Sequence, residues 1–137
     1  MDWKECEKDK IVKEISLDKP LVNSLLSNSL KKLKTQELLK LDETTASSKI
    51  SLTYDSLREL LEALSISKGY KIYNHECYCA FLKEILNESF LSEKFDSLRK
   101  IRNSINYYGK DISIEEAKSI LTEIIVLIKQ IKKQFFK

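Results

Sequence analysis

The sequence predicts an all-α protein, because three features of the chain favour long helices. Only two glycines and one proline occur in 137 residues, which leaves little material for tight turns between strands. Hydrophobic residues recur every three or four positions over long stretches, as one face of an α-helix requires. Residues typical of helix ends separate these stretches. We therefore expect an up-and-down antiparallel bundle of four main helices plus one short helix.

The first two long helices are predicted at residues 18–41 and 42–68. Asp18 is a typical N-cap, and Pro20 suits the first turn, where its missing N–H costs nothing. The apolar residues of the second helix follow one another in steps of three and four, which is the clearest amphipathic pattern in the chain. Gly69 then provides a left-handed residue after its end.

Three further helices are predicted from their caps. Asn74 begins a short third helix, and Ser92 begins a fourth that ends at Gly109. Ser113 and the glutamate three residues later have the form of a capping box, which begins a fifth helix running to about Phe135. These helices belong to one bundle domain at residues 18–137, since a chain of this length suits a single core.

Residues 1–17 form an N-terminal extension whose structure the sequence leaves open. Trp3, Ile11, Val12 and Ile15 would lie together on a short amphipathic helix, but most of the stretch is lysine and glutamate. A docked extension and a frayed tail are both compatible with this pattern.

Composition excludes several classes of protein. The longest apolar run, residues 124–128, is far shorter than the roughly 20 residues that cross a bilayer, so we expect no membrane association. A net charge of +3 from 24 basic and 21 acidic residues does not by itself indicate a nucleic-acid-binding protein. The polar N-terminal stretch is unlike a secretory signal. Three cysteines without a framework spacing favour reduced thiols, and therefore a cytoplasmic protein.

His75, Cys77 and Cys79 look like metal ligands at first sight. A structural zinc site needs four ligands, usually in two separated pairs, and no second pair exists in the sequence. Cys6 would join them only if the chain folded back, which nothing in the sequence supports. We therefore expect no metal site, and since phosphate-loop and nucleophile motifs are also missing, no cofactor.

Arg102 is the most informative residue of the chain. It lies four residues after Leu98 and three before Ile105, so it belongs to the apolar stripe of its helix, with Asn106 one turn later. An arginine drawn toward a packed interior is costly unless its five donors find partners. Those partners would be an anion, a carboxylate of another helix or a second subunit; alternatively, Arg102 lies at the edge of the stripe and reaches water.

Residues 102–109, Arg-Asn-Ser-Ile-Asn-Tyr-Tyr-Gly, resemble the motif of prokaryotic HEPN domains. In those helical bundles an arginine and a polar residue are followed a few positions later by a histidine. The order of a helix ended by Gly69, a short helix opening at 74–76 with Asn-His-Glu, and the Arg102 helix is similar to small archaeal members. The resemblance covers residues 18–137.

The resemblance implies a homodimer in which the two motif helices face each other and both Arg102 side chains share a cleft. Active members of the family are metal-independent ribonucleases, often toxins. Others pair with small MNT-type nucleotidyltransferases in toxin–antitoxin systems. By this resemblance, Arg99, Arg102, Asn103 and Asn106 are candidate contacts to RNA or another phosphate-bearing ligand.

The sequence departs from the family at Tyr107, where a histidine is expected. A phenol with a pKa near 10 cannot transfer protons at neutral pH as an imidazole with a pKa near 6.5 can. If the protein is a ribonuclease, Arg102 would stabilise the phosphorane and Tyr107 would position the 2′-hydroxyl. His75 lies on another helix, and we do not expect it to replace the missing histidine.

The sequence therefore predicts a dimeric binding or partner module, for a nucleotidyltransferase or for RNA, with a degenerate ribonuclease motif. Two alternatives stay open. One is a weak metal-independent endoribonuclease that uses Arg102, and the other is a purely structural bundle in which Arg102 forms an intersubunit salt bridge.

Overall fold

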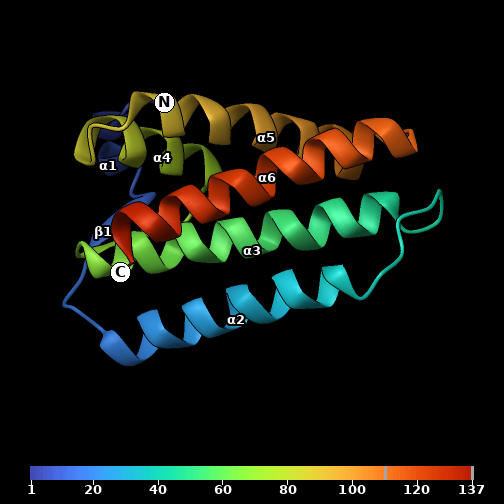
Figure 1. Cartoon of the computed structure of the whole chain (residues 1–137). Helices are drawn as coiled ribbons and strands as arrows, with labels where there is room; N and C mark the ends of the chain where they lie inside the picture. Colours follow the sequence, from blue (N-terminus) through green and yellow to red (C-terminus); the bar gives the residue numbers. More distant parts are fainter. Residues whose placement is uncertain (110, 137) are drawn as a thin grey trace.

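A computed structural model describes residues 1–109 and 111–136, with all side chains in these ranges except those of Tyr107 and Tyr108. The chain is mostly helical, as predicted (Figure 1). No helix in the described part is long and apolar enough to cross a membrane. The elements are α1 (Trp3–Lys8), β1 (Val12–Glu14), α2 (Lys19–Glu37), α3 (Ala46–Ser67), β2 (Tyr70–Ile72), α4 (His75–Ala80), the π-helical turn η1 (Phe81–Ile85), α5 (Ser89–Tyr108) and α6 (Ile114–Phe135).

Most helix ends lie where the sequence predicts them. Asp18, Asn74 and Ser113 each accept a hydrogen bond from a backbone N–H in the first turn of the helix that follows. Ser113 also forms the predicted capping box. Gly69 and Gly109 both have positive φ angles, of 90° and 61°, which a side chain would make unfavourable.

Two helix ends differ from the prediction. Helix α5 begins at Ser89, before Ser92, because the Ser92 hydroxyl donates to the carbonyl of Cys79 (2.8 Å) and so binds α4 instead of capping its own helix. Helix α2 ends at Glu37, short of residue 41. There the ammonium of Lys49 donates to two carbonyls at the end of α2, at 2.7 and 2.6 Å, and satisfies them in place of further helix.

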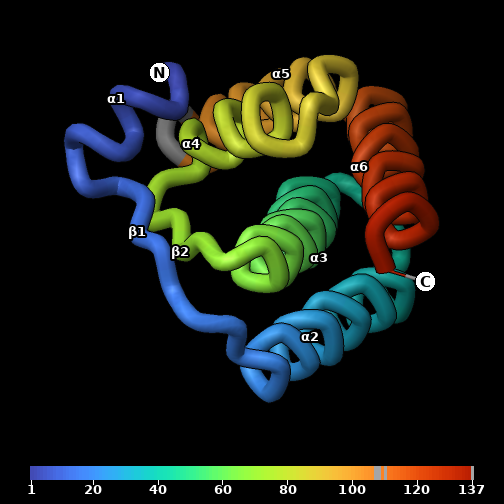
Figure 2. The backbone as a smooth tube through the Cα atoms, turned by 90° about the vertical axis from the view of Figure 1, so that its left-hand side faces the viewer, coloured from blue at the N-terminus to red at the C-terminus, as the bar shows by residue number. Residues whose placement is uncertain are grey.

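Helix α3 lies at the centre of the molecule, with α2, α5 and α6 around it (Figure 2). The apolar stripe predicted for this helix is buried, including Ile50, Tyr54 and Leu57. The opposite side is buried as well, against α2, although the sequence pattern predicts a solvent-exposed polar face there. The buried polar residues of α3 are Lys49, Thr53, Ser56, Glu59 and Ser65.

Polar contacts hold α2 against α3. The hydroxyls of Ser29 and Ser56, both fully buried, each donate to the carbonyl of the other residue at 2.7 Å. Such small side chains let the two backbones approach closely. Lys32 on α2 forms an ion pair with the buried carboxylate of Glu59. Most polar atoms on the buried side of α3 are therefore hydrogen-bonded, whereas the second carboxylate oxygen of Glu59, Oε2, has no hydrogen-bond partner among the described residues.

The N-terminal extension is docked on the bundle. Helix α1 is shorter than the predicted amphipathic segment, and the residues after it form β1, which pairs antiparallel with β2 so that Val12 lies opposite Ile72. This pair is the one sheet found in the described residues, and the sequence analysis did not predict it. Trp3 is buried in the main core, with its ring 5.1 Å from that of Tyr70.

A disulfide joins Cys6 of α1 to Cys77 of α4, with the two Cα atoms 6.1 Å apart. The prediction that the cysteines are reduced is therefore wrong for these two residues. Nothing in the sequence indicated that residues 1–17 fold back onto α4. Because α1 docks there, Cys6 and Cys77 meet in the core, and both residues are fully buried. Cys79 is a free thiol.

We expect reduction of the disulfide, or the substitution Cys6→Ser, to destabilise the protein by about 2–4 kcal/mol. The bond links residues 71 positions apart, and closing a loop of that length removes much of the entropy of the unfolded chain. Urea denaturation with and without reductant measures the effect. Cys79→Ser is the matched control and should change little; an unchanged midpoint on reduction of the wild type would contradict the expectation.

Candidate functional site

The guanidinium of Arg102 lies over an aromatic ring of its own chain. Its central carbon is 5.2 Å from the centroid of the Tyr54 ring, which α3 holds fully buried. Arg102 itself is half-buried. An arginine over the face of a tyrosine ring is stabilised by the quadrupole of that ring. Tyr54 of α3 therefore offsets part of the cost of placing the Arg102 charge on the apolar stripe of α5.

Tyr54 connects Arg102 to the single histidine of the chain. The Tyr54 hydroxyl lies 3.0 Å from Nδ1 of His75, the first residue of α4. Three helices, α3, α4 and α5, thus contribute one side chain each to a group that we call the Arg102 cluster: Tyr54, His75 and Arg102. The sequence analysis did not place His75 beside Arg102; its expectation that His75 does not replace the missing histidine of the motif stays a prediction.

His75 is neutral at physiological pH. Burial, together with the positive charges of Arg58, Arg102 and Arg99, lowers the pKa of His75 from 6.5 to about 4, although the nearby Asp55 carboxylate opposes the shift. With this pKa, about one imidazole in a thousand carries a charge at neutral pH.

The Tyr54 phenol keeps its proton, because burial raises its pKa well above the ordinary value, against the opposing effect of Arg102. A protonated hydroxyl can donate to Nδ1 of a neutral imidazole. In that arrangement the imidazole carries its own proton on Nε2, and His75 presents an N–H donor on the side away from Tyr54.

Two further arginines, Arg99 and Arg58, affect the pKa of His75, and each forms an ion pair with a carboxylate. Arg99 donates to Asp96 one turn earlier on α5, at 2.7 Å. Hydrogen bonds from Arg99 and from a neighbouring lysine outweigh the effect of burial and lower the pKa of the Asp96 carboxyl. Arg58 on α3 lies 3.3 Å from Glu62 and 3.8 Å from Glu59. Both arginines are therefore oriented, and both are partly neutralised.

The other predicted contacts lie on two sides of α5. Asn106 is exposed, and its side-chain oxygen accepts a hydrogen bond from the Ser51 hydroxyl at 3.1 Å, which aims its amide group beside α3. Asn103 is half-buried and follows Arg102 by one residue, a turn of about 100° around the helix, so it faces away from the cluster. The side chain of Tyr107 lies outside the described residues.

The metal-like residues at the start of α4 are used in other ways. Cys77 is bonded to Cys6. Burial and the carboxylate of Asp96, whose Oδ1 lies 3.7 Å from the thiol, raise the pKa of Cys79 to about 11, so this thiol stays protonated. Within the described residues no group of three or more histidine, cysteine or acidic side chains could hold a metal ion.

In comparisons with known proteins, no family model, no curated protein and no solved structure matches the chain. The resemblance to HEPN domains therefore stays a prediction. What the protein does must be inferred from the geometry and charge of the Arg102 cluster.

The depressed pKa of His75 predicts a loss of stability in mild acid. The unfolded chain binds a proton at this residue below about pH 6.5, whereas the folded protein does so only near pH 4. Stability should therefore fall between these values as the pH falls. For a half-buried group we expect about 1–2 kcal/mol after allowing for solvent screening.

Urea denaturation at several pH values measures this slope in the wild type and in His75→Gln, which keeps hydrogen-bonding capacity but does not titrate. We expect the variant to be less sensitive to acid over this range. The same slope in both proteins would show that His75 is not the group responsible.

Proposed function

We propose that the protein is a HEPN-like binding module that binds phosphate groups of RNA at the Arg102 cluster without cleaving the chain, and that it acts as a homodimer. One observation carries the proposal: the Arg102 guanidinium lies over the Tyr54 ring, and the hydroxyl of the same tyrosine lies 3.0 Å from His75, so a cation and two uncharged polar groups meet at one half-buried place. A half-buried site of this kind favours an anion over a cation or a neutral ligand.

The groups of the site are suited to phosphate. Arginine has a planar fork of donors that matches two phosphate oxygens, and the ring of Tyr54 supports one face of the Arg102 guanidinium. The amide of Asn106 adds an uncharged donor, and Nε2 of His75 adds a second one when the Tyr54 hydroxyl donates to Nδ1. In RNA the phosphates carry most of the binding energy, so such a site binds strands with little dependence on sequence.

The same geometry argues for binding rather than catalysis. A general base works best when its pKa is near the operating pH, and the pKa of His75 is about 4. The hydrogen bond to Tyr54 occupies Nδ1, and the remaining nitrogen is then a donor. Tyr107 supplies a phenol where the family motif has an imidazole. The Arg102 cluster can therefore hold a phosphate group but is poorly equipped to move protons around it.

A second candidate function, a weak metal-independent endoribonuclease, is favoured by the presence of His75 beside Tyr54. In such a reaction the 2′-oxygen attacks the adjacent phosphorus and the bond to the 5′-oxygen breaks. The proton of the 2′-hydroxyl is lost and one is gained by the leaving 5′-oxygen. His75 would assist only if a bound phosphate raised its pKa toward neutrality, which a negative charge next to an imidazole does.

A nucleotidyltransferase partner and a toxin–antitoxin role are parts of the proposal that come from the resemblance. A cytoplasmic location was expected because the cysteines were predicted to be reduced, and the Cys6–Cys77 disulfide removes that argument. Structural disulfides persist mainly in oxidising compartments.

Arg102→Ala should weaken binding of a fluorescently labelled single-stranded RNA by about 10–100-fold, since a hydrogen bond to a charged group contributes about 1.5–3 kcal/mol. Fluorescence anisotropy measures the affinity. Lys31→Ala is the matched control: it removes the same charge from an exposed position on α2, on the other side of α3. The control should bind RNA almost as the wild type does.

The same variant separates the binding role from a structural one. Loss of the contact with Tyr54 should cost the fold about 1 kcal/mol. If Arg102→Ala instead lost about 3–5 kcal/mol of stability, as expected when a buried ion pair is broken, and bound RNA normally, Arg102 would be a structural residue and the proposal would fail.

Purified protein should cleave single-stranded RNA slowly or not at all in EDTA. General acid–base catalysis contributes about 10²–10⁴-fold, so its loss is easily seen on a gel. Rapid cleavage that both His75→Gln and Arg102→Ala abolish would establish the endoribonuclease instead.

A further inference from the structure

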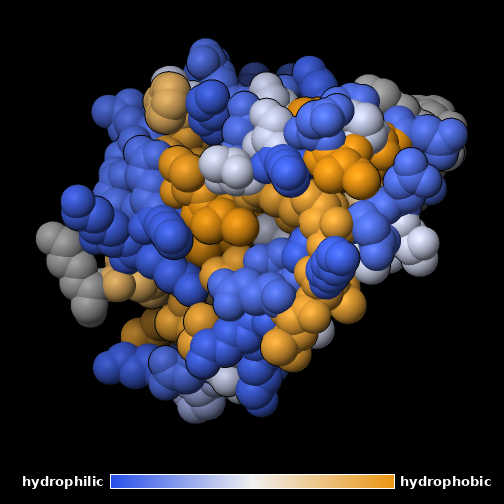
Figure 3. All heavy atoms as spheres, turned by 45° about the vertical axis from the view of Figure 1, so that its right-hand side comes forward, coloured by the Kyte–Doolittle hydropathy of each residue, from blue (hydrophilic) through white to orange (hydrophobic). Residues whose placement is uncertain are grey.

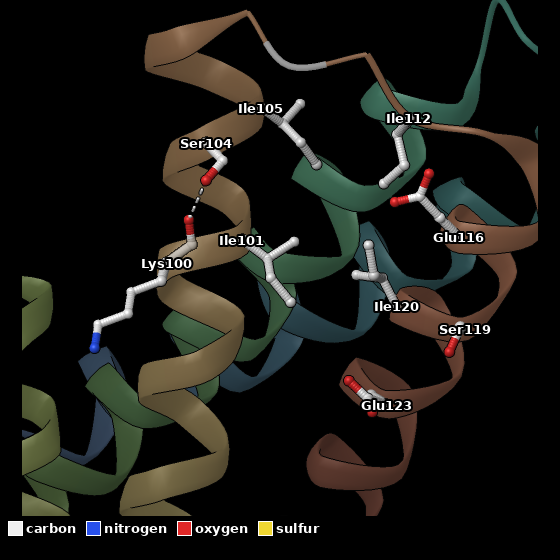
Figure 4. A pocket seen from close by; sticks show the side chains of 9 residues that line it. All are labelled: Lys100, Ile101, Ser104, Ile105, Ile112, Glu116, Ser119, Ile120 and Glu123. Carbon is white, nitrogen blue, oxygen red and sulfur yellow. Dashed lines mark hydrogen bonds between the residues drawn. The ribbon is translucent and has the colours of Figure 1, made fainter.

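An apolar hollow lies between α5 and α6, on a different side of α5 from Arg102. It has a volume of about 380 Å³, and four isoleucines line it. Ile101 and Ile105 of α5 point toward Ile120 of α6 and toward Ile112, which precedes that helix (Figure 4). A hollow of this size lined by isoleucines exposes apolar surface that the chain itself does not cover.

A second hollow, of about 300 Å³, continues the first along the same two helices, and Glu123 lines both. At this end Phe90 of α5 and Val126 of α6 are among the most exposed large hydrophobic residues of the described chain, at 58% and 57%. Hydrophobic side chains likewise gather in patches between polar ones on the face shown in Figure 3. We call the two hollows together the α5–α6 groove.

The two edges of the α5–α6 groove carry opposite charges. On α5 the lining includes Lys94 and Lys100, and on α6 it includes Glu116 and Glu123. All four residues are exposed. One edge is therefore basic and the other acidic, with apolar side chains between them.

We propose that the α5–α6 groove is the surface through which two copies of this chain associate. When two copies meet face to face around a two-fold axis that runs along the groove, α5 of each copy lies on α6 of the other. Each lysine edge then faces a glutamate edge, and the exposed Phe90 of each copy lies on the Val126 side of its partner. The groove is thus complementary to itself in charge and apolar character, which favours a second copy over an unrelated protein.

This inference rests on the proposed homodimer, but it does not use the RNA site. The proposed interface differs from the one implied by the resemblance to HEPN domains, in which the two Arg102 side chains share a cleft. Arg102 contacts Tyr54 and Asn106 contacts Ser51, so the residues that were expected to need a partner subunit are engaged within their own chain. In the α5–α6 groove, Lys100 also pairs with Asp96 and Glu116 also caps α6, but Phe90 and Val126 stay exposed.

Sedimentation equilibrium at micromolar concentration tests the interface. The wild-type chain should be a dimer. In Glu123→Lys, a lysine faces lysines, and in Lys94→Glu, a glutamate faces glutamates; neither change removes the capping box of α6 or the Lys100–Asp96 pair, and the dissociation constant should rise by about tenfold or more in each. An equimolar mixture of the two variants restores opposite charges on both edges, and it should form a heterodimer with wild-type affinity.

Lys31→Glu/Lys34→Glu, a reversal of two exposed charges on α2, is the matched control and should leave the dimer intact. A monomeric wild type would overturn the interface, and so would a dimer that neither groove variant weakens. If the mixture failed to reassociate while both variants stayed folded by circular dichroism, charge complementarity would be refuted. RNA binding that still depends on Arg102 in a monomer would refute the interface and the homodimer, and it would leave standing the proposal that the Arg102 cluster binds RNA phosphates.

Discussion

The burial of α3 between α2, α5 and α6 is the constraint on which the rest of the structure depends. The polar side chains on its buried faces cannot reach solvent, and an unpaired buried polar group costs more than a hydrogen bond returns. Three of the buried polar residues of α3 therefore bind α2 or the residues just after it. Ser56 fixes the distance to α2, Glu59 binds Lys32, and Lys49 ends α2 by binding its last carbonyls. These contacts set the position of α2 more specifically than apolar packing alone would.

The same burial of α3 creates the Arg102 cluster. Tyr54 is deep enough for its phenol to stay protonated, yet its ring and hydroxyl reach the boundary of the core, where α4 and α5 meet α3. One side chain thus offers an aromatic face to a cation and a hydroxyl to an imidazole. Because the two contacts share a residue, the histidine and the arginine are held in a fixed relation although they lie on separate helices.

The helical content and most helix ends could be predicted because they depend on local sequence. Caps such as Asp18 and Ser113 act within one turn, and the apolar stripe of α3 follows from its spacing. The burial of Glu59 could not be predicted, since its partner, Lys32, lies on a different helix whose packing the pattern does not specify. Arg102 was identifiable as a charge on an apolar stripe. His75 could not be identified as part of the site, because Tyr54 and Arg102, which lie near it in the fold, are far from it in the sequence.

The pairing of β1 with β2 also determines the order in which the chain can assemble. Val12 meets Ile72 only after all of α2 and α3 has been made, because both helices lie between the two strands. The residues of β1 are therefore synthesised well before those of β2, and the two strands pair only once β2 has been made. Contacts between distant residues carry the entropy cost of closing a long loop, whereas the α2–α3 hairpin forms from residues close in sequence. Docking of β1 is therefore opposed by a larger loop-closure entropy than formation of the α2–α3 hairpin.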